Sequence, residues 1–150
     1  MNRQEIYNRV KEHMLKQMER CTLNPFSNHR DSPMCAYRND QGHRCAVGCL
    51  MSDEVIKILG DATGGVGQLA NHARYYREGE DNLELTVASY TFFKDIGVNI
   101  MAGTPGYEEE KYPHGDTKFL TGLQNIHDNA PTFEWKDRLE AYALDYQLKI

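Results

Sequence analysis

The 150-residue chain has no apolar run near the roughly 20 residues that a membrane-spanning helix needs. Its first residues, MNRQEIYNRVKEH, also lack the apolar stretch of a secretion signal. We therefore expect no membrane partner and a location in the cytosol where the protein is made, so that thiols stay reduced. The four cysteines of the chain need not then form two disulfides.

An excess of positive charge is also missing. The formal net charge is −5, and the basic side chains are scattered apart from one small group. That group consists of Arg30, Arg38, His43 and Arg44. Binding to nucleic acid normally needs a basic face, so a nucleic-acid partner is not expected.

Apolar side chains recur at helical spacing along much of the chain, as in Ile6, Val10, Met14 and Met18. Asn2 and Glu5 predict a capping box for the first helix, Ser52 opens a second, and Gly97 ends a fourth. The expected helices cover residues 2–19, 52–59, 67–77, 82–96, 117–128 and 132–147. No linker divides the chain, so a single domain over residues 1–150 is expected.

Three of the four cysteines lie in the stretch CAYRNDQGHRCAVGC, residues 35–49. We predict a β-hairpin with strands at 34–39 and 43–49, because Asp40-Gln41-Gly42 suits a tight turn with a left-handed glycine. Tyr37 would then face Cys45, and Arg38 would lie beside Arg44 on the opposite face. The predicted fold class is α+β, with one hairpin or a small antiparallel sheet packed against about five helices.

A metal site finds little support in this stretch. Zinc sites favour Cys-x2-Cys pairs, and none is present. Cys45 and Cys49 would lie roughly 13 Å apart along a straight strand. A site from Cys35, Cys45 and His29 is geometrically conceivable, but buried, reduced cysteines are the commoner arrangement. We therefore predict no metal and no cofactor, and a metal-stabilised structural module stays an alternative.

A thiol nucleophile is a second alternative, because Cys45 and Cys49 precede a helix start that can lower a thiol pKa. His127 and Asp128 would supply its base and orienting acid. Adjacent residues on a helix do not face each other, so we expect Asp128 to orient His127 poorly. His127 is then expected to be a partly buried helix residue tied to a backbone carbonyl.

Two features point to an anion. Arg38 and Arg44 would repel each other across the hairpin unless an acidic group lies between them. That group is either an internal carboxylate, which we favour, or a phosphate or carboxylate ligand gripped by the arginines. The glycine-rich loop at residues 60–67 could cradle a phosphate at a helix start, but it lacks the Lys-Ser/Thr of a P-loop.

The motifs C-x-Y-R (35–38), G-x-x-C-A-V-G-x-L (42–50) and L-x-x-I-H-D (123–128) resemble those of small uncharacterised proteins from tailed phages and prophages. The resemblance covers roughly residues 1–59 and 117–150, and makes 60–116 a family-variable insertion. It implies a phage-type accessory protein in the host cytoplasm, with no reaction attached. Such proteins often block a host factor or sequester a defence signal.

The predicted function is therefore binding without catalysis, to a host protein or to a small anionic, nucleotide-like ligand. The predicted contacts are Arg38, His43, Arg44, His127 and Asp128, together with the loops at 60–67 and 103–116. The main alternative is a small hydrolase or nucleotide-processing enzyme with a Cys/His centre. An enzyme would join a thiol to His127 in a cleft, whereas a ligand-binding protein would have a pocket beside Arg38 and Arg44.

Overall fold

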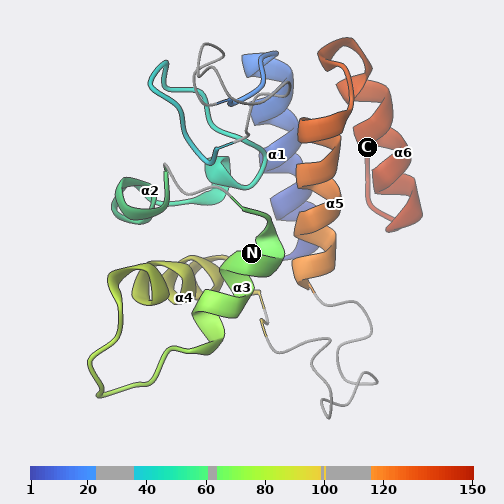
Figure 1. Ribbon diagram of the computed structural model, residues 1–150. Helices are drawn as coiled ribbons and strands as arrows, with labels where there is room; N and C mark the ends of the chain where they lie inside the picture. Colours follow the sequence, from blue (N-terminus) through green and yellow to red (C-terminus); the bar gives the residue numbers. More distant parts are fainter. Residues whose placement is uncertain (23–35, 61–63, 99, 101–115) are drawn as a thin grey trace.

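Helices account for most of the structure that the computed structural model describes, which covers residues 1–22, 36–60, 64–98, 100 and 116–150 (Figure 1). The helices are α1 (Arg3–Gln17), α2 (Asp53–Leu59), α3 (Val66–Arg74), α4 (Glu84–Ile96), α5 (Asp116–Asn129) and α6 (Trp135–Asp145). Two short 3₁₀ turns, η1 (Gly48–Leu50) and η3 (Thr132–Glu134), precede α2 and α6.

The predicted helix ends are confirmed where a capping residue marks them. The side chain of Asn2 accepts a hydrogen bond from the Glu5 amide, and Glu5 returns one to the Asn2 amide. Ser52 caps α2 at its start, and Gly97 ends α4 with a left-handed φ of 72°. These caps are local in sequence, which is why the sequence alone locates them.

The predicted hairpin is wrong, and the described part of the chain is helical rather than α+β. The single β-bridge there pairs Arg38 with Arg44 around the turn. Gly42 does take the left-handed conformation predicted for it, with φ 80°. After Cys45 the chain turns into η1, and Val47 already has the helical angles φ −83° and ψ −37°. Of the predicted strands over 34–39 and 43–49, the described residues 36–39 and 43–49 therefore do not form a ladder.

The strand pairing stops after this bridge because residues 47 and 48 make other contacts instead. Gly48 lies directly over the carbonyl oxygen of Tyr37, where the Cβ of any other residue would collide. The amide of Val47 donates to the side chain of Gln124 on α5, 3.1 Å away, instead of to a partner strand. A strand needs its amides for the neighbouring strand, so these contacts favour a turn.

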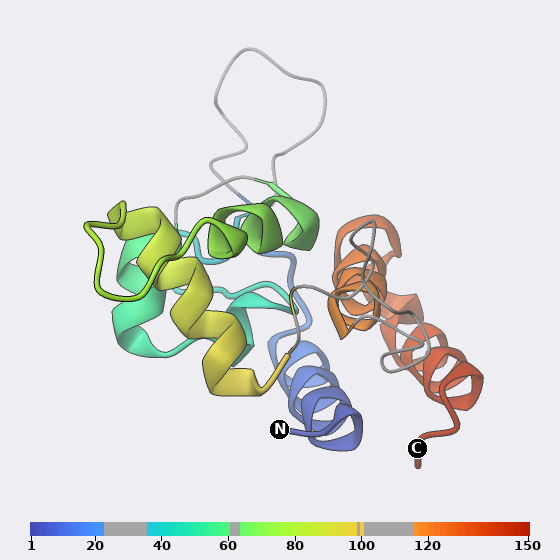
Figure 2. The ribbon, with the colours of Figure 1, turned by 90° about the horizontal axis from the view of Figure 1, so that it is seen from below.

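The helices form two groups that lie on either side of residues 36–50. Figures 1 and 2 show α1, α5 and α6 side by side, while α2, α3 and α4 pack together beyond the turn. Helix α3 also contacts α5, which joins the two groups. The predicted insertion at 60–116 thus contributes α3 and α4, and these helices pack on the rest of the molecule.

Large aromatic side chains fill the interior between the helices. Trp135, Tyr7, Phe92, Phe93 and Phe119 are all fully buried. Burying each contributes about 1.5–3 kcal/mol relative to leaving it exposed. Among the described helices, none combines the length and apolar character needed to cross a membrane.

Candidate functional site

The five predicted contact residues do not form one cluster. Arg38 is half-buried beside the end of α2, where a Cβ at Gly60 would lie 3.2 Å from its Nε. His43 lies on the other side of the turn, with Nε2 3.2 Å from the largely exposed carboxylate of Glu19. An exposed pair of this kind contributes at most about 1 kcal/mol to stability.

His127 and Asp128 belong to a buried structural network. His127 is fully buried and stacks on Trp135, with ring centroids 5.2 Å apart. Its Nε2 accepts a hydrogen bond from the Cys21 amide at 3.3 Å, and its Nδ1 lies 2.7 Å from Oδ1 of Asp128. The expectation that Asp128 orients His127 poorly is wrong, because the neighbouring carboxylate reaches around the helix to the ring.

The same carboxylate also receives a bond from Gln124. Gln124 Nε2 donates to Asp128 Oδ1 at 2.7 Å, while Gln124 Oε1 accepts from the Val47 amide. Three segments that are distant in sequence, around residues 21, 47 and 127, are therefore tied together. Both ring nitrogens of His127 are occupied by these bonds, so His127 has no free nitrogen to act as a base.

The described thiols are protonated at neutral pH. Burial raises the pKa of the Cys21 thiol to about 11, and Cys21 Sγ donates to the His43 carbonyl at 3.0 Å. Burial likewise raises the pKa of fully buried Cys45 far above its ordinary value. A nucleophilic cysteine needs the thiolate, so the environment of these residues does not activate them.

Within the described ranges, no three His, Cys, Asp or Glu side chains are grouped as metal ligands. Cys35 and His29, which the sequence offers as partners of Cys45, lie outside those ranges. Residues 61–63 of the glycine-rich loop and 101–115 of the second predicted loop lie outside them as well.

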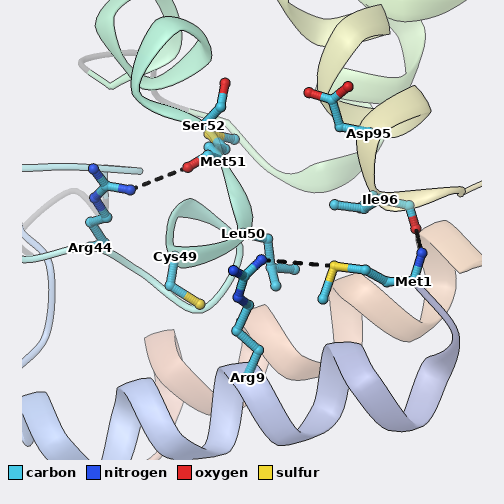
Figure 3. A pocket seen from close by; sticks show the side chains of 9 residues that line it. All are labelled: Met1, Arg9, Arg44, Cys49, Leu50, Met51, Ser52, Asp95 and Ile96. Atoms are coloured by element: carbon cyan, nitrogen blue, oxygen red, sulfur yellow. Dashed lines mark hydrogen bonds between the residues drawn. The ribbon is translucent and has the colours of Figure 1, made fainter.

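A cavity of ≈ 380 Å³ lies between α1, the η1–α2 junction and the end of α4 (Figure 3). Of the five predicted contact residues, only Arg44 lines it. The lining residues are Met1, Arg9, Arg44, Cys49, Leu50, Met51, Ser52, Asp95 and Ile96. Two guanidinium groups therefore lie on one small cavity whose wall is part polar and part apolar.

Helix α1 holds Arg44 firmly in position. The Gln17 amide group donates to the Arg44 carbonyl and accepts from the Arg44 amide, both at 3.0 Å. His13 Nε2 lies 2.8 Å from the same carbonyl and donates to it. The guanidinium of Arg44 donates to the Met51 carbonyl and to Asp53 Oδ1, at 3.2 and 3.0 Å. Asp53 is thus the carboxylate of the protein itself that pairs with Arg44, and its side chain is 85% exposed.

Arg9 is a site residue that the sequence analysis missed. It is exposed on α1, and its Nη1 makes a weak hydrogen bond to Met1 Sδ at 3.9 Å. The charges of both arginines affect the pKa of the Cys49 thiol on the cavity wall. Burial raises the pKa of this thiol to about 12, and the charges of Arg9 and Arg44 act in the opposite direction. The positive fields of the two guanidinium groups therefore overlap at the cavity.

No family model, curated protein or solved structure matches this chain. The resemblance to phage proteins therefore stays a prediction, and the function has to be argued from the site.

The described residues of the cavity wall include groups that suit an anion. Arginine donates several N–H groups in a planar array that matches a phosphate or carboxylate. Among the described lining residues there is no imidazole, and the thiol of Cys49 donates to the Ala46 carbonyl at 3.1 Å. These groups can hold an anion, but they do not form a nucleophile paired with a base.

Proposed function

We propose that this protein binds a small anionic ligand in the cavity beside Arg9 and Arg44, and that it catalyses no reaction. The observation that carries the proposal is the presence of two guanidinium groups on one cavity of ≈ 380 Å³. The guanidinium of Arg44 is already held by the Met51 carbonyl and Asp53, so a ligand would meet it with little further loss of side-chain freedom.

The size of the cavity favours a small molecule over a protein partner. Sites for small ligands enclose about 300–1,000 Å³, and this cavity falls at the lower end of that range. Together with the resemblance to phage proteins, it favours a phage-type accessory protein that sequesters a small anion in the host cytoplasm. A blocked host protein is less favoured, because the residues that carry the proposal line a cavity.

The hydrolase alternative is disfavoured by the state of its own residues. It requires a thiolate and an imidazole with a free nitrogen. Burial raises the pKa of Cys21 and Cys49 well above neutral, and His127 is engaged at both ring nitrogens.

Titration with pyrophosphate tests the proposal, using isothermal calorimetry and amide chemical shifts. We expect shifts at residues 49–52 and a dissociation constant at least about tenfold weaker in Arg9→Gln, since a charged hydrogen bond contributes about 1.5–3 kcal/mol. Arg138→Gln is the matched control, because Arg138 is an exposed helical arginine that does not line the cavity.

Arg9 is exposed, so the Arg9→Gln variant should keep the melting temperature of the parent protein. The proposal is wrong if pyrophosphate shifts no amide at residues 49–52. It is equally wrong if Arg138→Gln weakens binding as much as Arg9→Gln does, because binding would then follow net charge alone.

A further inference from the structure

Asp95 occupies a place that helix stability does not explain. It is in the last turn of α4, where the partial negative charge of the helix end disfavours a carboxylate. Its side chain forms no hydrogen bond or ion pair with any other described residue. Asp95 nevertheless lines the same cavity as Arg9 and Arg44.

The cavity therefore has an acidic group in one part and two basic groups in another. Figure 3 shows the carboxylate of Asp95 near one end, with the hydroxyl of Ser52 also on that side. The guanidinium groups of Arg9 and Arg44 reach the cavity from other elements, α1 and the turn before η1. The apolar side chains of Leu50 and Ile96 lie between these polar groups.

A ligand that carries only negative charge would leave the carboxylate of Asp95 without a partner. Asp95 is exposed and makes no ion pair with Arg9 or Arg44, so its carboxylate is available to a ligand. A carboxylate can accept several hydrogen bonds but donates none. The group that complements it is an N–H donor, either an ammonium or an amine on an aromatic ring.

We propose that the ligand joins an anionic group, held by Arg9 and Arg44, to an N–H donor group, held by Asp95. This inference rests on the proposed function and names its ligand class. Two kinds of molecule carry the required chemistry: a small zwitterion such as an aminoalkyl phosphonate, and a nucleotide whose base bears an amine. The apolar residues between the two ends would contact the middle of either molecule.

Two matched pairs of probes test the inference by calorimetry at fixed ionic strength. The first pair is 3-aminopropylphosphonate and propylphosphonate, and the second is AMP and purine riboside 5′-monophosphate, which is AMP without its amine. Within each pair, one member carries the donor and the other does not. The amine lowers the negative charge of the phosphonate, so the arginines alone would favour propylphosphonate, whereas Asp95 reverses that order.

We expect the donor-bearing member to bind about tenfold tighter in one of the two pairs, and that pair identifies the source of the ligand. Asp95→Asn should reduce the ratio to about one, and Asp137→Asn, an exposed acid on α6 outside the cavity, should leave it unchanged. Asp95→Asn should also keep or raise the melting temperature, because it removes a charge that the end of α4 disfavours.

Equal binding of both members in both pairs would overturn the inference, as would a ratio that survives in Asp95→Asn. In either case an affinity that still depends on Arg9 would leave the proposed function in place. If none of the four probes binds and pyrophosphate does not bind either, the inference and the proposed function both fail.

Discussion

Both ring nitrogens of His127 take part in hydrogen bonds within the fold. One ring nitrogen accepts from the Cys21 amide, and the other donates to Asp128. The tautomer with the proton on Nδ1 satisfies both contacts. A general base would have to release one of these buried bonds before it could act, and an unpaired buried group costs about 1–3 kcal/mol.

Two substitutions at Asp128 separate a structural role from a catalytic one. Asp128→Asn keeps an oxygen that can accept from both His127 and Gln124, so we expect a loss of less than about 1 kcal/mol in the free energy of unfolding. Asp128→Ala removes the acceptor and should cost about 1–3 kcal/mol. Urea denaturation followed by circular dichroism measures both values.

If neither Asp128→Asn nor Asp128→Ala changes the free energy of unfolding, the hydrogen bonds of this carboxylate do not stabilise the fold. The structural assignment of His127 and Asp128 would then be wrong, and the Cys/His hydrolase would regain support.

At the scale of elements, the contact between α1 and the turn at 36–47 builds the site. The side-chain amide of Gln17 pairs with both backbone groups of Arg44, in the way that a neighbouring strand would. His13 adds a third hydrogen bond to the same residue. Helix α1 thus carries Arg9 and also fixes Arg44, so both cations of the cavity depend on one helix.

The titration of His13 makes this contact sensitive to pH. Burial lowers the pKa of His13 from 6.5, the positive charge of Arg44 acts in the same direction, and the bond to the Arg44 carbonyl opposes them. The unfolded chain then binds this proton more readily than the folded chain does. Stability from this residue is therefore complete above the unfolded pKa, and it falls as the pH drops through about 6.5.

We expect His13→Gln to flatten the fall in unfolding free energy between about pH 7.5 and 5.5. Glutamine can still donate to the Arg44 carbonyl but does not titrate. His72→Gln is the control, because His72 is exposed on α3. Urea titrations at several pH values give the slope, and an unchanged slope in His13→Gln would contradict this account.

At the scale of the whole molecule, residues 36–50 run between two groups of helices, and residues 45–48 are buried there. Cys45, Ala46, Val47 and Leu50 all belong to the interior. Cys21 joins them from the segment after α1, and its pKa of about 11 reflects that burial. Thiols in such positions become accessible when the molecule opens as a unit.

Thiol labelling measures that opening. A Cys35→Ser variant keeps Cys21, Cys45 and Cys49. In this variant we expect Cys21 and Cys45 to react with an aromatic disulfide reagent at the rate of global unfolding. Cys49, which is half-buried on the cavity wall, should react first. Peptide mapping by mass spectrometry gives the order. Fast labelling of Cys21 or Cys45 in the native protein would mean that they are accessible, and would favour a thiol enzyme.

The helices and their ends could be predicted from the sequence because the signals are local. The bonds between Asn2 and Glu5, the Ser52 cap and the left-handed Gly97 involve residues at most a few positions apart. The same holds for the turn at Gly42. Apolar spacing then identified the faces that helices such as α1 and α4 bury.

Only the tertiary structure decided between a hairpin and a buried turn at residues 36–50. Alternating small apolar and polar residues suit both, and the choice depended on Gln124 taking the Val47 amide and on Gly48 meeting Tyr37. The cavity was decided in the same way, since Arg9, Arg44 and Asp95 come from three separate segments. Of these three residues, the sequence analysis identified Arg44 alone. It missed Arg9 and Asp95 because charges that meet only through packing leave no local pattern to find.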